Sequence, residues 1–312
     1  RIYRGFTRTE VATSIWYANM LSGFTTHGAN ILGNLMQGSM QLATVMATNP
    51  RHGGEALRGW INGFGEGWTQ GKAIMKTGRG SREFDAKVNK PGEASNVLEL
   101  VDFQRDFPDM NKTWASARQK HTNAMRYVTR AMKAVDSVFY YPAREAYARV
   151  VTAKLLEGQY QGKELAQKVR ELLNVEPLQF VAARKTAEAE GFTGIELALR
   201  TANLIEERRR QTDVGRKASD AAEQFALETT YNNEPQGWAG ILYNGLVPLT
   251  DTLAPGGVPV LKIFLPFLRV PTNVFNASMN YTPLGALRAL RGVPTRAMRG
   301  SDERTKIERR EF

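Results

Sequence analysis

From Val11 to Asn49 the chain contains no Asp, Glu, Lys or Arg, and this gap is the strongest constraint on its fold. The whole chain carries 42 Lys and Arg and 31 Asp and Glu, so the gap is a local feature. The stretch is rich in Leu, Met, Ala and Gln, which favour helix, and lacks the alternation of a strand. We predict two helices that meet near residues 22–27, inside an apolar packing unit. The second helix should end at Asn49, because Pro50 follows it.

His27 lies inside this charge-free stretch and could be mistaken for a catalytic residue. A neutral imidazole is far easier to bury than Lys or Arg, so we interpret His27 as a residue that caps or joins helices. The three histidines, His27, His52 and His121, match no metal-ligand spacing. The chain has no cysteine, which excludes disulfides and thiolate metal sites. We expect no catalytic residue, no cofactor and no metal, and therefore no enzyme.

Glycines and aromatic residues each recur every four residues after this stretch. The two rows are Gly59, Gly63, Gly67 and Gly71, and Trp60, Phe64 and Trp68. On a helix each row forms a stripe. Each glycine costs a helix about 1 kcal/mol relative to alanine, so the row indicates close backbone approach, as in small-residue motifs of membrane helices. The aromatic row would suit an interface between water and hydrocarbon. The alternative is a soluble glycine-rich loop whose tryptophans lie in a core.

The middle of the chain has the pattern of helices with apolar stripes. From residue 114 to 138 the predicted stripe consists of Trp114, Ala117, His121, Ala124, Val128, Ala131, Val135 and Val138. Pro142 interrupts this pattern, so we expect a kinked or broken helix there. Shorter helices follow. Pro177 is placed for a first helical turn and Gly191 for a helix end.

The predicted fold class is all-α, with many helices and five regions. These are a charge-poor, glycine-rich helical region (1–76), a linker (77–96), a charged helical bundle (97–234), a proline-rich apolar region (235–287) and a basic tail (288–312). Short proline-broken helices are expected in the fourth region, which offers no run of about 20 apolar residues for an ordinary membrane span. We also expect the chain to be part of a longer or processed polypeptide.

The net charge of +11 favours anionic partners, either nucleic acid or lipid headgroups. Candidate phosphate contacts are Arg208, Arg209, Arg210, Arg288 and Arg291. Aromatic residues are segregated from these arginines, whereas a single-strand binding platform interleaves the two. We expect non-specific DNA contacts at most. The alternative is a solvated helix face and a solubilising tail.

Two elements of the chain resemble the large polyvalent or internal virion proteins of phages and prophages. The first is NMLSGFTTHGANILGN, in which Thr26, His27, Asn30, Gly33 and Asn34 match the family pattern. The second is FLPFLRVPTNVFNASMNYTPLG, in which Pro266, Phe267, Arg269, Pro271 and Asn273 match, while Val270 replaces the usual threonine. The elements occur in the family's order and span most of the chain, and the resemblance assigns no catalytic residue.

The resemblance implies a virion protein of the capsid interior or tail that is ejected into the host cell envelope. We expect a segment of an ejection protein that oligomerises as a ring or tube and helps form a conduit for the genome. Its partners would be copies of itself, other virion, ejection or tail proteins, non-specific DNA and the host membrane. Two alternatives remain: a non-catalytic scaffold region of a polyvalent phage enzyme, such as a virion RNA polymerase or antirestriction protein, and a basic DNA-packing protein of the capsid interior.

Overall fold

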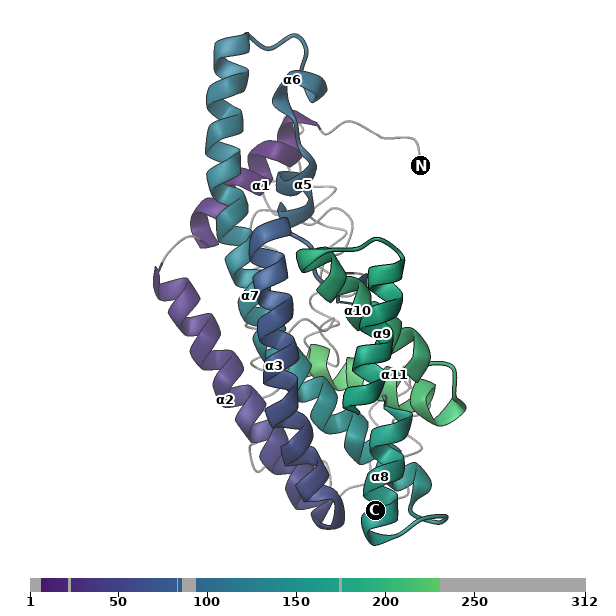
Figure 1. Cartoon of the computed structure of the whole chain (residues 1–312). Helices are drawn as coiled ribbons and strands as arrows, with labels where there is room; N and C mark the ends of the chain where they lie inside the picture. The colour runs from purple at the N-terminus through teal and green to yellow at the C-terminus, as the bar shows by residue number, and fades with distance from the viewer. Residues whose placement is uncertain (1–6, 22–23, 83, 86–93, 174–175, 231–312) are drawn as a thin grey trace. The chain divides into compact units, whose positions relative to one another are not determined.

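The fold is all-α over the residues that the structure, a computed structural model, describes: 7–21, 24–82, 84–85, 94–173 and 176–230 (Figure 1). The α-helices are α1 (Arg8–Leu21), α2 (Phe24–Thr48), α3 (Gly53–Thr77), α5 (Ala94–Leu100), α6 (Phe103–Asp106), α7 (Lys112–Leu156), α8 (Gly162–Leu172), α9 (Pro177–Ala189), α10 (Gly194–Arg209) and α11 (Asp213–Thr229). A 3₁₀ turn, Pro50–His52, joins α2 to α3. The predicted regions 235–287 and 288–312 lie outside the described residues.

Local sequence signals account for several helix ends. Helix α2 stops one residue before Asn49, and Pro50 begins the 3₁₀ turn, as predicted. Pro177 occupies the first turn of α9, where its missing N–H is not needed. Gly191 follows the end of α9 with a φ of 88°, which only glycine adopts without strain. These three predictions are confirmed.

The glycine row lies on a helix, α3, and its close partner is α7 of the same chain. A Cβ on Gly63 would lie 2.5 Å from Pro142 Cα, and one on Gly59 would lie 2.5 Å from the Glu145 carbonyl oxygen. The helical interpretation is therefore confirmed, and the loop alternative is wrong. The glycines let two backbones meet inside this chain, so they are not available to a second subunit or to lipid.

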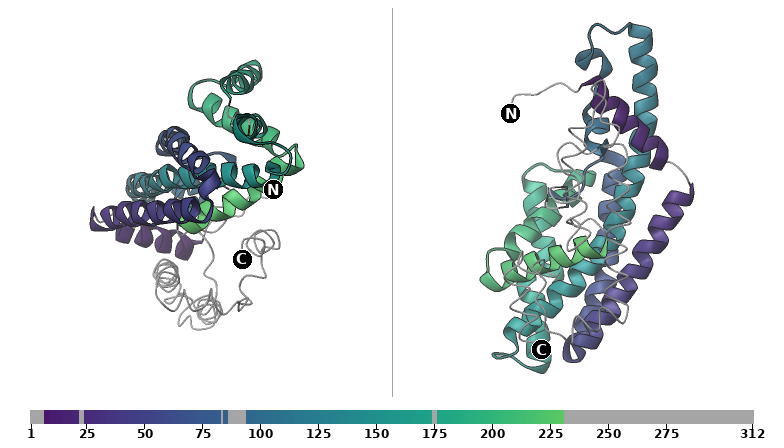
Figure 2. Two further views of the ribbon diagram at one scale, coloured as in Figure 1. Left: turned by 90° about the horizontal axis from the view of Figure 1, so that it is seen from below. Right: turned by 180° about the vertical axis from the view of Figure 1, so that it is seen from behind.

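A single core joins the charge-poor region to the charged region. It includes Val45 of α2, Trp60 of α3, Tyr140 of α7 and Phe225 of α11. Figures 1 and 2 show α2, α3 and α7 running side by side. The segment interpreted as a linker also contributes, because Phe84 is 1% exposed in this core. The regions predicted from charge density are therefore not separate packing units, because residues of three of them share this core.

Among the described residues, two smaller apolar clusters are separate from this core. One joins α1 and α5 to the beginning of α7 and includes Val11, Leu98 and Phe103. The other lies between α9 and α10 and includes Ala183, Ala187 and Leu204. Because the α9–α10 hairpin has a cluster of its own, its attachment to α3 and α7 depends on other contacts.

The predicted stripe on the first half of α7 is wrong. Trp114 is 64% exposed and His121 is exposed, whereas Ala115 and Thr122 are buried. The stripe had the right period, but it was placed one position away from the covered side, which is the side that α1, α5 and α6 contact. His121 is therefore not a packing residue.

A kink or a break was expected at Pro142, and the break is absent, since α7 continues through it as one helix of 45 residues; the kink stays a prediction. Proline has no N–H for the Val138 carbonyl, which lies four residues earlier. That turn is packed tightly against α3, because a Cβ on Gly67 would lie 3.3 Å from the Val138 oxygen. Tertiary packing holds the helix together where the backbone bond is missing. No helix in the described part of the chain is long and apolar enough to cross a membrane.

Candidate functional site

The outward side of α2 is apolar and uncharged. The helix contains no Asp, Glu, Lys or Arg. Five large apolar side chains on it are 40% to 65% exposed: Ile31, Leu32, Leu35, Met36 and Met40. We call these five residues the α2 face. Their spacings of one, three and four place them on one side of the helix, and a contiguous exposed apolar patch of this kind is typical of an interaction site.

The inward side of α2 is partly polar, so its polarity is reversed relative to an ordinary surface helix. Asn34 is 1% exposed, and its Nδ2 donates to Asp136 Oδ1 of α7 at 3.3 Å. Gln37 is 6% exposed. Gly38 makes room for the Trp60 ring, since a Cβ there would lie 2.7 Å from the ring. Amides and a small residue therefore hold the middle of α2, and Leu42, Val45 and Met46 pack its last turns against the core, while the five residues of the α2 face point outward.

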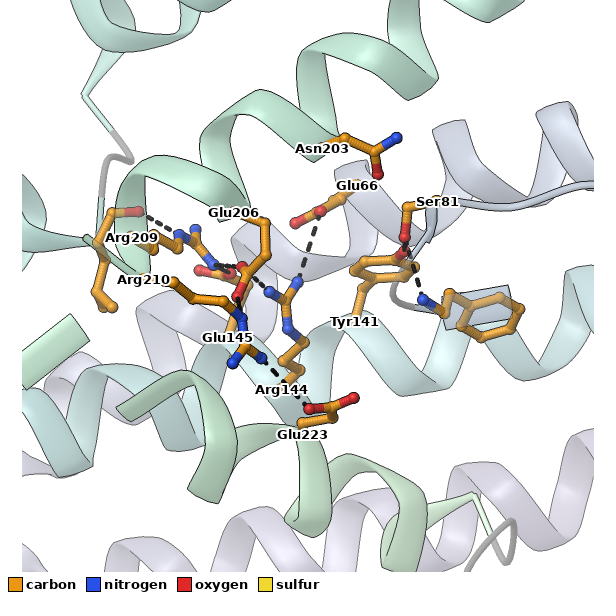
Figure 3. A network of polar contacts seen from close by, with 12 residues as sticks. Glu66, Ser81, Tyr141, Arg144, Glu145, Asn203, Glu206, Arg209, Arg210 and Glu223 are labelled. Carbon is orange, nitrogen blue, oxygen red and sulfur yellow. Dashed lines mark hydrogen bonds and ion pairs between the residues drawn. The ribbon is translucent and has the colours of Figure 1, made fainter. Parts of the chain in front are cut away.

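A second feature is a network of buried charges that attaches α10 to α7 (Figure 3). Arg144 and Arg209 are 3% and 4% exposed. Arg144 of α7 pairs with Glu206 of α10, and Arg209 of α10 pairs with Glu145 of α7. Arg209 also donates to the Leu173 carbonyl oxygen. Buried ion pairs therefore join the α9–α10 hairpin to α7.

The network extends to α11 through a third arginine. Arg210 Nε lies 2.9 Å from Glu206, and its Nη2 lies 3.4 Å from Glu223 of α11. Burial opposes ionisation of Glu206, but Arg144, Arg209 and Arg210 outweigh it and lower the pKa of Glu206 to about 2. This carboxylate is therefore charged throughout the physiological range.

Glu66 is the carboxyl group that the network compensates least. Arg144 and Arg209 face three carboxyl groups, those of Glu66, Glu145 and Glu206. Glu66 lies 3.9 Å from Arg144, whereas Glu206 is in direct contact with it. Desolvation and the neighbouring Glu145 charge raise the pKa of Glu66 to about 7. The Glu66 side chain borders a cavity of about 310 Å³ between α3 and the hairpin, and 31% of its surface is exposed to solvent.

This arrangement predicts that Glu66→Gln stabilises the protein at high pH. The pKa of Glu66 is higher in the folded chain, at about 7, than the usual 4.5, so folding favours the protonated form. Stability is then lost as pH rises from about 4.5 to about 7, and the loss is complete above that range. Glutamine imitates the protonated form. We expect Glu66→Gln to raise the free energy of unfolding by about 1 kcal/mol at pH 8, discounted for exposure, and to change it little at pH 5.

Urea unfolding across this pH range measures the effect. Glu188→Gln, at an exposed glutamate on α9, is the matched control and should show no such trend. If the free energy of unfolding changes with pH in the same way for the wild type and Glu66→Gln, then Glu66 is not the group whose ionisation destabilises the fold.

The first family-like element, residues 19–34, begins in the last turn of α1 and continues into α2. Thr26, His27 and Asn30 lie within this helix, but their side chains are outside what the structure describes. Gly33 has no atom within 4 Å of where its Cβ would be, and Asn34 is the buried amide that contacts α7. The second element, Pro266, Phe267, Arg269, Pro271 and Asn273, lies outside the described residues.

The predicted aromatic row does not form one surface. Trp60 is 8% exposed and contacts Phe64 edge to face, with ring centroids 5.8 Å apart. Trp68 is 63% exposed. In the glycine row, Gly71 is packed more loosely than Gly63, since its Cβ would lie 3.3 Å from the nearest atom. The two rows therefore serve mainly to pack α3.

The predicted phosphate-binding arginines have different environments. Arg209 is buried and cannot reach a phosphate, and Arg210 is engaged with Glu206, Asp220 and Glu223. Arg208 is partly exposed. Arg288 and Arg291 lie outside the described residues.

The charge network was not predicted from the sequence. Its members look like ordinary residues of solvated helix faces, because adjacent Arg and Glu occur at many positions in the middle region. One signal was present: Glu66 lies between Gly63 and Gly67, in the part of α3 that must approach another helix closely. The position of Glu66 predicted that residues near it on α3 are buried. It did not indicate which arginines would pair with Glu66.

The two histidines whose side chains the structure describes, His52 and His121, do not join a group of acidic residues that could hold a metal. His52 is buried, with Nε2 3.4 Å from Glu157 Oε2, and His121 is on the exposed part of α7. Within the described ranges, no three His, Cys, Asp or Glu side chains are grouped to hold a metal ion. Comparison of the chain with protein-family models, curated proteins and solved structures finds no match.

Proposed function

We propose that this chain is a structural segment of a bacteriophage internal virion or ejection protein. In this proposal it oligomerises as a ring or tube and helps form a conduit for genome delivery across the host cell envelope. The chain would reside in the capsid interior or tail and pass to the envelope after ejection. Its other partners would be virion, ejection or tail proteins, non-specific DNA and the host membrane.

One observation carries the proposal: a long helix without charge, α2, exposes leucines and methionines and contains most of the first family-like element. Such a surface suits a component that assembles with other protein. The buried network adds rigidity between α7, α10 and α11, which suits a wall that must keep its form. The basic balance of the chain would attract a passing genome through its phosphates without reading its bases.

The test is to locate the chain in particles before and during infection. A tagged chain should be found inside the virion, and after adsorption it should fractionate with the host envelope and appear there in cryo-electron tomograms. The control is a tagged major capsid protein, which should stay outside the cell. A chain that remains in the emptied capsid would contradict the conduit and favour DNA packing. A chain found only in the host cytoplasm, as part of a larger enzyme, would favour a scaffold role.

A further inference from the structure

We infer that the α2 face pairs with the α2 face of a second copy of this chain. This inference deepens the proposed function, on which it rests, by assigning the surface through which copies associate. The glycine row, the other surface that small residues make available, is occupied by α7 within each copy. We therefore assign contact between copies to the α2 face and not to the glycine row.

Charge is the first argument for a second copy. Each copy carries a net charge of +11, so two copies repel one another, and the repulsion is smallest where the facing surfaces carry no charge. In a symmetric dimer the same patch meets itself, so a charge near the two-fold axis would face its own copy. Helix α2 has no charged residue along its 25 positions, so it meets this requirement.

The same absence of charge argues against other occupants. Helices that bind lipid surfaces carry Lys and Arg beside their apolar face to hold anionic headgroups. Helix α2 has none, and it has no basic residue in its last turn. Nucleic acid is held through its phosphates, and the α2 face offers none of the cations needed for that.

The distribution of side chains on α2 indicates how two copies meet. The large exposed residues lie between 31 and 40, and Met36, at 65%, is the most exposed. An antiparallel pair whose two-fold axis passes near Met36 places Leu32 of each copy opposite Met40 of the other. Every large side chain of the patch is then covered by an equivalent patch, which removes apolar surface from water.

Charge exchange at Met36 tests this pairing in the full chain. Near the axis, Met36→Glu brings two carboxylates together and Met36→Lys brings two ammonium groups together. Each variant alone should weaken self-association by at least about 30-fold, as expected for a central interface residue. An equimolar mixture should recover most of the wild-type affinity, because Glu then faces Lys. Analytical ultracentrifugation measures all of these, and Met36 is exposed, so both variants should fold.

Two further measurements strengthen the test. The chain has no cysteine, so Met36→Cys introduces its only thiol, and mild oxidation should yield a covalent dimer. Ser116→Cys, at an exposed position of α7, is the control and should yield little. Association of the wild type should strengthen between low and high salt, because salt screens the repulsion of two +11 chains.

Several results would overturn the inference. One is a Met36→Glu variant that associates as well as the wild type. Another is a mixture of Glu and Lys variants that associates no better than either alone, which would mean that α2 binds a different surface. A wild-type chain that is monomeric at about 100 μM, well above the micromolar range of ordinary interfaces, would also overturn it. So would binding of neutral lipid vesicles that Met36→Glu abolishes while the chain stays monomeric.

Failure of the proposed function would look different. A chain that pairs through α2 in solution but is absent from the virion and the envelope would contradict the phage role and leave the interface intact. A chain that reaches the envelope with unpaired α2 helices would do the reverse.

Discussion

Gly63→Leu is expected to abolish the packing of α3 on α7 and to lower the free energy of unfolding by about 3 kcal/mol or more. The first side-chain carbon alone would lie 2.5 Å from Pro142 Cα and 2.6 Å from the Tyr141 carbonyl oxygen. Both neighbours are backbone atoms, so no side-chain rotation relieves the clash. The helices must separate, and they would expose the core between Trp60 and Tyr140. Urea unfolding followed by circular dichroism measures the loss.

Gly65→Ala is the matched control on the same helix, two residues away. No atom lies within 4 Å of a Cβ at Gly65. This substitution should stabilise the protein by about 0.5–1 kcal/mol, since alanine favours helix over glycine. If Gly63→Leu unfolds at the same urea concentration as the wild type, the close contact between the two helices is wrong. If only oligomerisation changes, the glycines contact a second subunit.

Arg209→Met should destabilise the protein by about 3–5 kcal/mol, the usual result of removing one partner from a buried ion pair. Arg209 is 4% exposed, and its guanidinium serves both Glu145 and the Leu173 carbonyl oxygen. Burial opposes ionisation of Glu145, but Arg209 and then Arg144 outweigh it and keep the pKa of Glu145 below its usual value. Without Arg209, the negative charge of Glu145 stays buried but loses the cation that contributes most to offsetting its desolvation. Urea unfolding at pH 7 measures the change.

Two further variants separate charge from packing in this network. Arg184→Met removes an exposed arginine that pairs with Glu188 on α9, and it should change stability by no more than about 0.5 kcal/mol. Adding Glu145→Gln to Arg209→Met should recover part of the lost stability, because the buried charge is then neutral. Equal effects of Arg209→Met and Arg184→Met would mean that the network contributes no more than a surface pair.

The positions and ends of the helices were largely predictable, because they depend on residues close together in the chain. Pro50, Pro177 and Gly191 act on their own backbone, through a missing N–H or an allowed positive φ, whatever surrounds them. The repeat of glycines every four residues likewise predicted a close helix contact, since few other structures require it. These features are local, so the sequence by itself determined them.

The partner of each helix face was decided only by the tertiary structure. The residues of the glycine row require a close neighbour, but they do not say whether it is α7, another subunit or lipid. Along α7 the period of the stripe was right and its side was wrong, because small side chains such as Ala115 and Ala117 are compatible with either side until α1 and α5 cover one of them.

The buried charges show the same division. Glu66, Arg144 and Glu206 are far apart in the chain and read as solvated residues, and their pairing exists only because α3, α7 and α10 converge. The electrostatic energy of a charge depends on its distance from other charges and from water. Neither distance is set by neighbours in sequence. The sequence therefore determined where the helices form, and the packing of helices distant in sequence decided which side of α2 stays exposed and which carboxyl group titrates near neutrality.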